Sequence, residues 1–176
     1  MCGIAGYIGD QKIESSVVTK TLTLMKNRGP DYKNFYQTEI NKAQFLLLHS
    51  RLSIIDLESR SNQPLFKDDL VIVFNGEIYN YLEIKSEINA IKNIKWNGTS
   101  DTEVLLEALA LWGIDKTLKK IRGIFAFGLY DKFLENLYLV RDRFGVKPLY
   151  YYEGKNCIIF ASELKPIIKS KFFENE

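Results

Sequence analysis

The sequence predicts an α+β fold in which two antiparallel sheets pack face to face and carry helices on their outer sides. Many short apolar segments of strand-like composition are separated by brief turn signals, which favours antiparallel pairing. Only a few segments have apolar residues at helical spacing. The chain has 176 residues, of which 46% are hydrophobic and 13% aromatic, so one domain can bury a sizeable core.

The first part of the chain is expected to form strands around one helix. A buried strand over Cys2–Ile8 holds the chain start inside the fold, and apolar residues at helical spacing predict a helix over Ile13–Met25. The segments Phe35–Thr38 and Ala43–Leu48 are β-prone and close together, which indicates a hairpin. A further strand is expected over Leu70–Phe74.

Two helix starts have clear signals. Asn80 and Glu83 have the spacing of an N-cap and the acidic residue that returns its hydrogen bond, and Ser100 and Glu103 repeat that arrangement. Gly113 is expected to end the second of these helices.

Turn-prone residues divide the following part of the chain into short strands. These are expected over Gly123–Tyr130, Asn136–Arg141, Leu149–Glu153 and Cys157–Ala161. Because the connections between them are short, we expect antiparallel pairing.

Composition excludes several classes of protein. The 24 Lys and Arg residues exceed the 22 Asp and Glu residues by only two and are scattered along the chain, which argues against nucleic acid as a partner. No apolar run approaches the roughly 20 residues that a membrane-spanning helix needs. The amino terminus lacks the basic region of a secretory signal. We therefore expect a soluble, cytoplasmic protein that binds neither nucleic acid nor membrane.

The cysteines and the single histidine argue against a metal site. Cys2 and Cys157 are expected to be reduced thiols, because the chain shows no secretory signal. Together with His49 they are too few for the clustered ligands of a structural zinc site. His49 is expected to be a packed or hydrogen-bonded structural residue.

Cys2 is a candidate nucleophile because of its position. Removal of Met1, which a small second side chain permits, leaves a thiol and a free α-amine on one residue. The α-amine has an ordinary pKa of about 7.7 to 8.0, so part of it is neutral near pH 7 and can accept the thiol proton. A chain that keeps Met1 has no such base and is expected to be inactive. From the residues alone, a buried, inert cysteine stays the commoner alternative.

Further polar residues have both a catalytic and a structural interpretation. Asn75 and Gly76, at the end of a predicted strand, can supply a side-chain amide and a main-chain N–H to an oxyanion, but Asn-Gly is also a strong turn signal. Arg51 can bind a carboxylate, although most arginines are simply solvated. Asp101 can hold an ammonium group, but an acid in the first turn of a helix is also favoured by the helix dipole.

Several segments taken together resemble class II glutamine amidotransferases. They are Met1–Ile4, Arg28–Asp31, His49–Asp56, Asn62–Leu65, Asn75–Asn80 and Ser100–Glu103. Later segments are similar to the amino-terminal half of glutamine-hydrolysing asparagine synthetases, namely Gly123–Phe127, Arg141–Tyr150 and Phe160–Lys165. The resemblance covers essentially the whole chain, so residues 1–176 are identified as one glutamine amidotransferase domain of this class.

The resemblance implies an amino-terminal-nucleophile hydrolase fold, a four-layer αββα sandwich, and release of ammonia from L-glutamine. In such an enzyme Cys2 attacks the side-chain amide with its α-amine as general base, and the Asn75 side chain and the Gly76 N–H form the oxyanion hole. Arg51 is expected to bind the substrate α-carboxylate and Asp101 its α-ammonium group. The rest of the glutamine pocket is expected to comprise Leu52, Ser53, Ile54, Ile55 and Glu77.

The resemblance also implies a partner domain. Asparagine synthetases continue into a domain that binds ATP and magnesium through a Ser-Gly-Gly-x-Asp-Ser loop, which this sequence does not contain. The chain ends at Lys169–Glu176, about where the connection between the two domains begins. We therefore expect either a truncated amidotransferase domain or a stand-alone one that delivers ammonia to a synthetase partner. No cofactor and no metal are expected in this domain itself.

Alternatives to this function stay open. The domain could supply ammonia to a different acceptor, such as a sugar or a peptide, or belong to an aminosugar or purine-pathway amidotransferase. A non-catalytic module that binds glutamine or docks a partner is the alternative from outside the enzymes. A homodimer is compatible with the sequence.

Overall fold

The computed structural model describes residues 1–170 and arranges their strands in two antiparallel sheets. The larger sheet has the strand order β2 (Tyr32–Ile40), β3 (Ala43–Arg51), β1 (Gly3–Gly9), β9 (Cys157–Ala161) and β8 (Tyr150–Glu153). The smaller sheet has the order β4 (Leu65–Lys67), β5 (Leu70–Ile78), β6 (Gly123–Asp131) and β7 (Asn136–Arg141). The segment 171–176, where we expected the connection to a second domain, lies outside the described residues.

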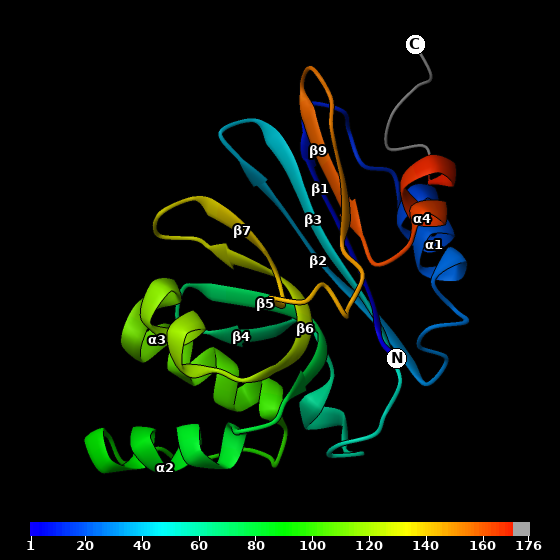
Figure 1. Cartoon of the computed structure of the whole chain (residues 1–176). Helices are drawn as coiled ribbons and strands as arrows, with labels where there is room; N and C mark the ends of the chain where they lie inside the picture. Colours follow the sequence, from blue (N-terminus) through cyan, green and yellow to red (C-terminus); the bar gives the residue numbers. More distant parts are fainter. Residues whose placement is uncertain (171–176) are drawn as a thin grey trace.

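Helices cover the outer face of each sheet (Figure 1). α1 (Ser15–Leu24) and α4 (Leu164–Lys169) lie on the five-stranded sheet, whereas α3 (Asp101–Lys120) lies on the four-stranded sheet with α2 (Tyr81–Ile91) packed beside it. Clusters of buried apolar residues fill the interfaces between the successive layers. The expected four-layer αββα sandwich is confirmed.

Large interior side chains set how the two sheets pack. Phe160 of β9 is fully buried, and its ring occupies the space that a side chain on Gly6 of β1 would need. On the other sheet, a Cβ atom added to Gly128 of β6 would come within 2.8 Å of the same ring. The Phe45 ring of β3 packs against Tyr130 of β6, with centroids 4.3 Å apart. The contacts of Phe160 with Gly128 and of Phe45 with Tyr130 span the interface between the sheets and fix their relative position.

Most predicted elements are present, with small shifts at their ends. The predicted hairpin is formed by β2 and β3, and its turn residues Asn41 and Lys42 have φ of 49° and 72°, as a tight hairpin turn requires. The later predicted strands are β6, β7, β8 and β9, and all their pairings are antiparallel. The short strand β4, a 3₁₀ turn at Ser59–Ser61 and helix α4 are additional to the predicted elements.

The prediction that Asn75 and Gly76 lie at a strand end, or form a turn, is wrong. Both residues lie inside β5, where Asn75 pairs with Ala126 and Gly76 with Phe125 of β6. Gly76 is needed for close approach of the two strands, because a Cβ atom there would overlap the Ile124 carbonyl oxygen. Pairing along the whole strand therefore overrides the turn propensity of the Asn-Gly pair.

The capping arrangement predicted at the start of α3 is confirmed in one of its two bonds. The Ser100 Oγ accepts a hydrogen bond from the Glu103 N–H at 3.2 Å, as an N-cap does. The Glu103 carboxylate accepts instead from the N–H groups of Asn97 and Gly98, at 2.8 and 2.9 Å. Glu103 therefore fixes the segment that leads into the helix.

The arrangement predicted at Asn80 is wrong in its bonds, although α2 does begin there. The Asn80 amide accepts from the Arg122 N–H and donates to the Lys120 carbonyl, so it joins the end of α3 to the start of β6. Glu83 forms an ion pair with the Arg122 side chain instead of a cap.

Gly113 interrupts α3 with a φ of 73° and a ψ of 173°, but helical structure resumes and continues to Lys120.

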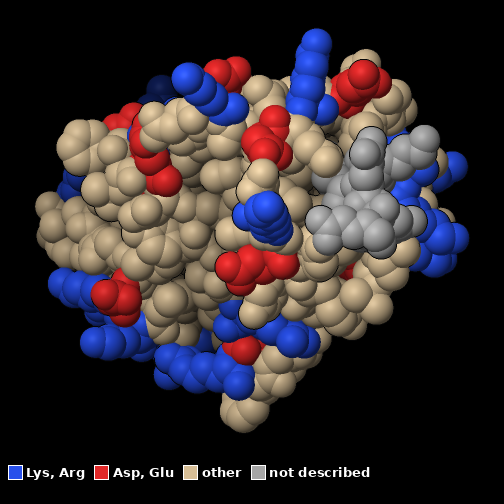
Figure 2. All heavy atoms as spheres, turned by 90° about the horizontal axis from the view of Figure 1, so that it is seen from above, with Lys and Arg blue, Asp and Glu red and all other residues tan. Residues whose placement is uncertain are grey.

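Basic and acidic side chains are interspersed on the face shown in Figure 2, in keeping with the small net charge of +2. Both Cys2 and Cys157 are free thiols. Within residues 1–170, no helix is long and apolar enough to cross a membrane.

Candidate active site

A pocket of about 180 Å³ collects residues from both sheets and from the beginning of α3. Nine of the predicted site residues line it: Cys2, Arg51, Leu52, Ile54, Ile55, Asn75, Gly76, Glu77 and Asp101. Ser53 is not among the lining residues, and its N–H donates to the Asp31 carboxylate at 2.7 Å. The fold thus brings together residues that are far apart in the sequence.

The Cys2 thiol lies on the pocket wall, immediately before β1. Its Sγ donates to the Leu52 carbonyl at 3.7 Å and accepts from the Leu52 N–H at 3.4 Å. Burial raises the pKa of the Cys2 thiol, and this outweighs the Leu52 hydrogen bond and the positive charges of the chain terminus, Arg51 and Arg28. The thiol is therefore protonated at neutral pH and needs a base before it can act as a nucleophile.

The Asn75 side chain has a polar group that the described residues leave unsatisfied. Asn75 is 1% exposed, and its Nδ2 atom has no hydrogen-bond partner within residues 1–170. A buried donor without a partner is costly, and such groups are rare in folded proteins. Because Asn75 and Cys2 line the same pocket, Nδ2 is available to an oxygen atom of a molecule bound against the thiol.

The strand register leaves the Gly76 N–H outside the sheet ladder. Residues along an antiparallel strand alternate between bonding one neighbour and facing away from it. Phe74 and Ile78 face away from β6, since their N–H groups bond the Gln63 side chain and the Asp101 carboxylate at 2.6 and 2.9 Å. Gly76 shares this orientation by alternation, and β4 on that side pairs only with residues 70–72. Its N–H therefore lies on the side of β5 that borders the pocket.

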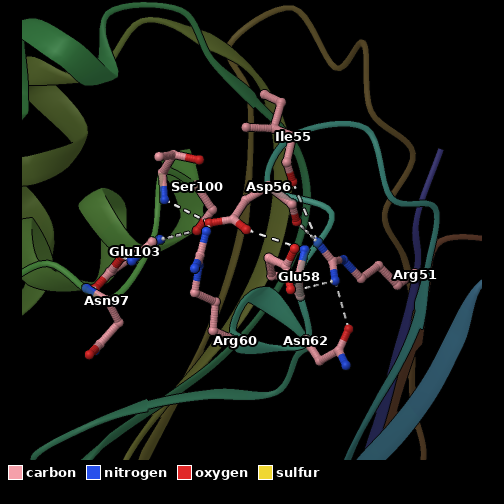
Figure 3. Close-up of polar contacts among 11 residues, drawn as sticks. Arg51, Ile55, Asp56, Glu58, Arg60, Asn62, Asn97, Ser100 and Glu103 are labelled. Atoms are coloured by element: carbon pink, nitrogen blue, oxygen red, sulfur yellow. Dashed lines mark hydrogen bonds and ion pairs between the residues drawn. The ribbon is translucent and has the colours of Figure 1, made fainter.

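Arg51 is a buried cation in the pocket wall, 5% exposed. One terminal nitrogen donates to the Glu58 carbonyl at 2.9 Å and to the Asn62 side chain at 2.7 Å. The other donates to the carbonyls of Ile55, at 3.4 Å, and Asp56 (Figure 3). These bonds wrap the segment 54–62 around the guanidinium. A carboxylate that binds Arg51 has to share or replace them.

Asp101 is a buried acidic side chain in the same pocket, 4% exposed and located in the first turn of α3. Its Oδ2 accepts from the Ile78 N–H at 2.9 Å. Burial raises the pKa of the Asp101 carboxyl, against the lowering effect of hydrogen bonds from Ile78 and Thr102, and the charge of Glu77 adds to the rise. A cationic group bound in the pocket would offset the cost of burying this carboxylate.

His49 lies behind the pocket and is not among the residues that line it. Its Nε2 is 3.2 Å from the Phe74 carbonyl, which can only accept, so the proton of the neutral ring is on Nε2. Complete burial lowers the pKa of His49 to about 3, with only partial opposition from the Phe74 hydrogen bond. The ring is neutral at physiological pH, in agreement with a structural role.

Some pocket residues are missing from the sequence-based prediction. Gln63 and Lys147 lie in the segments Asn62–Leu65 and Arg141–Tyr150, which carried the family resemblance and could have indicated them. Ser61 lines the pocket without any comparable signal in the sequence.

Within residues 1–170, no group of three His, Cys, Asp or Glu side chains is arranged to hold a metal ion.

Comparison with known families decides the relationship of this chain. A family model described as a glutamine amidotransferase domain matches residues 1–176. The chain belongs to this family. The amidotransferase domain is similar to asparagine synthetase [glutamine-hydrolyzing] 1 of Bacillus subtilis, with 37% identity over 175 residues, and to asparagine synthetase [glutamine-hydrolyzing] 3 of the same organism, with 34% identity over 175 residues.

The amidotransferase domain spans only part of these relatives. Each alignment covers 96% of this chain but 27% of the relative. Among solved structures, it is similar to the glutamine phosphoribosylpyrophosphate amidotransferase of B. subtilis complexed with ADP and GMP, with a TM-score of 0.78 and 18% identity. That match covers 96% of this chain and 43% of the other. At this low identity the structural likeness supports the fold alone.

Proposed function

We propose that this domain hydrolyses L-glutamine to L-glutamate and ammonia, with Cys2 as the nucleophile. The observation that carries the proposal is a single pocket that contains the Cys2 thiol, the Asn75 Nδ2 donor, which has no partner among residues 1–170, and one buried charge of each sign, Arg51 and Asp101. A free α-amino acid carries a carboxylate and an ammonium group on one carbon, so it can satisfy both charges. The family match and the glutamine-hydrolysing relatives agree with this substrate.

The active form begins at Cys2. While Met1 is attached, the nitrogen of Cys2 is a peptide nitrogen and cannot act as a base. Met1 also lines the pocket, so its removal enlarges the space beside the thiol. The α-amine that is released has a pKa near neutrality and is fixed on the same residue as the thiol.

Acyl transfer then proceeds in two steps. The neutral α-amine takes the thiol proton, and Sγ attacks the carbon of the substrate side-chain amide. The carbonyl oxygen becomes negative and is stabilised by Asn75 Nδ2 and the Gly76 N–H. The α-ammonium group returns the proton to the amide nitrogen, and the C–N bond breaks. Ammonia departs, and a thioester with Cys2 remains. Water, deprotonated by the same amine, cleaves the thioester to glutamate and restores the thiol.

Substrate binding uses the parts of the pocket away from the thiol. Arg51 binds the α-carboxylate and Asp101 binds the α-ammonium group, while Glu77 and the segment Leu52–Ile55 complete the walls. This chemistry needs no metal or cofactor. The ammonia passes to a synthetase domain, in the same chain or in a partner, which would hold ATP and magnesium. The much greater length of the asparagine synthetase relatives supports such a second domain.

The test compares the chain with its Cys2→Ala and Cys157→Ala variants. Intact mass is measured before and after treatment with the glutamine analogue 6-diazo-5-oxo-norleucine, together with glutamate release from glutamine. We expect a processed chain that lacks Met1, one adduct on Cys2, and glutamate release that disappears in Cys2→Ala but persists in Cys157→Ala. Turnover that survives Cys2→Ala would rule out the nucleophile. Reversible glutamine binding without adduct or turnover would favour a binding module.

A further inference from the structure

Asp56 lies on the loop between β3 and β4, beside the pocket but outside its lining. Its side chain is 0% exposed, and both carboxylate oxygens accept hydrogen bonds. Oδ2 accepts from the Thr99 N–H at 2.7 Å and from Arg60 Nε at 3.1 Å, and Oδ1 accepts from the Glu58 N–H at 3.3 Å. The carboxylate is therefore a fixed point within an irregular loop.

The main chain of Asp56 holds Arg51. The Asp56 carbonyl accepts from the Arg51 guanidinium, as do the carbonyls of the neighbouring residues Ile55 and Glu58. The bond from the Glu58 N–H to the Asp56 carboxylate stabilises the same short segment. The position of the guanidinium therefore depends on the conformation of this segment.

The side chain of Asp56 holds the beginning of α3. Thr99, whose N–H it binds, directly precedes the N-cap Ser100, and Asp101 follows. The approach is close, because a Cβ atom on Gly98 would overlap Asp56 Oδ2. Figure 3 shows Asp56 between the Arg51 guanidinium on one side and Ser100 on the other. One residue thus connects the two elements that carry the buried charges of the pocket.

We propose that Asp56 is a positioning residue that sets the distance between Arg51 and Asp101 and so adapts the pocket to the α-amino acid end of its ligand. The proposal rests on the glutaminase function proposed above, in which these two charges bind the carboxylate and ammonium groups on one carbon. The reacting amide is at the other end of glutamine. Asp56 therefore acts on recognition of the amino acid and leaves the reactivity of Cys2 unchanged.

The negative charge of Asp56 is essential to this role. Burial alone would raise the pKa of the Asp56 carboxyl, but hydrogen bonds from Thr99, Arg60, Ser61 and Glu58 outweigh it and hold the pKa well below its usual range. An asparagine has the same shape, yet it has only one acceptor oxygen, so it cannot accept both from the Glu58 N–H on one side and from Thr99 and Arg60 on the other. Asparagine tolerates the positive φ of 50° at this position, so Asp56→Asn changes the bonds and not the backbone preference.

The experiment measures how fast two reagents alkylate Cys2 in the processed chain. 6-Diazo-5-oxo-norleucine carries the α-amino acid group of glutamine, whereas iodoacetamide does not. The ratio of the two alkylation rates therefore reports on recognition of the amino acid separately from the reactivity of the thiol. The variants are Asp56→Asn and, as a matched control, Asp68→Asn. Asp68 is an exposed aspartate with the same φ of 50°, located away from the pocket between β4 and β5.

We expect Asp56→Asn to slow alkylation by the glutamine analogue roughly 10- to 100-fold, the effect of losing one charge-assisted hydrogen bond. The rate of alkylation by iodoacetamide should stay within about twofold of the rate in the unmodified chain, because the surroundings of the thiol are unchanged. The KM for glutamine should rise more than kcat falls, and Asp68→Asn should change nothing. Equal slowing of both reagents, or no slowing of either, would overturn the positioning role.

A milder variant covers the case in which Asp56→Asn does not fold. Arg60→Gln removes one bond to Asp56 on a half-exposed side chain and should slow the glutamine analogue selectively, by a smaller factor. An absence of selective slowing there would overturn the proposal. If the unmodified chain reacts with iodoacetamide at Cys2 but not with the glutamine analogue, the glutaminase function itself fails. That result is distinct from a positioning failure, in which the unmodified chain labels normally.

Discussion

The His49 imidazole of β3 donates a hydrogen bond across the sandwich to the main-chain carbonyl of Phe74 in β5, at 3.2 Å. The bond joins the two sheets directly behind the pocket. Arg51 follows two residues after His49 on one sheet, and Asn75 directly follows Phe74 on the other. A buried neutral histidine is therefore part of the scaffold that places the nucleophile side and the oxyanion side of the site together.

This histidine should make stability depend on pH. Its pKa is about 3 in the folded chain because the ring is fully buried, against about 6.5 in an unfolded chain. Between these values the unfolded state binds more protons, so the free energy of unfolding is highest above about pH 6.5 and falls as the pH decreases, by roughly 1.4 kcal/mol per pH unit at most. Urea unfolding over this range measures the slope. His49→Gln, which keeps a donor for Phe74 but does not titrate, should have a smaller slope, and equal slopes would contradict the assignment.

Replacing Asn75 should separate catalysis from stability. Asn75→Ala removes a donor that has no partner in the described part of the free protein, so we expect a small change in melting temperature. We expect kcat for glutamine to fall roughly 10²- to 10³-fold, the typical effect of losing one oxyanion donor. Glutamate release and thermal unfolding, measured on the same preparation, test both statements. An unchanged kcat would leave Asn75 as a strand residue only.

Gly76→Ala should destabilise the fold, since the new methyl group would overlap the Ile124 carbonyl of the paired strand. Overpacking of this kind typically costs about 1–3 kcal/mol, which lowers the melting temperature of a chain of this size by several degrees. Gly154→Ala is the matched control, because the atoms nearest to its added Cβ belong to the side chains of Tyr152 and Cys157, at 3.0 and 3.1 Å, and not to the backbone of a paired strand. Equal melting temperatures of the two variants would show that β5 and β6 can separate at no cost.

The strands were predictable where local pattern and pairing agree. Alternating apolar residues and short turns indicated β6 to β9 almost to the residue. At Asn75 and Gly76 the local turn signal disagreed with the pairing to β6, and the pairing prevailed. Helix α4 was missed, since its six residues contain Pro166, which is tolerated in a first helical turn but gives no periodic signal.

Most of the candidate site residues were predictable from family resemblance. The contacts that hold these residues in position were not. Cys2, Asn75 and Arg51 stand in recognisable segments, and they line one pocket. The bond between Asp56 and Thr99 joins residues 43 positions apart, and nothing in the local sequence of either residue specifies it. Contacts of this kind depend on how the loop after β3 packs against the beginning of α3, which only the folded chain defines.

The Phe160 ring, placed over glycines in both sheets, has a consequence for the reaction. The thiol lies immediately before β1, the strand that pairs with Phe160 of β9, whereas the expected oxyanion donors belong to the opposite sheet. The distance between the thiol and these donors therefore depends on the thickness of the apolar layer between the two sheets. A smaller side chain in place of Phe160 would let the sheets settle closer and change the attack geometry without altering any atom of the pocket. The rate of glutamine hydrolysis would then report the packing of the interior.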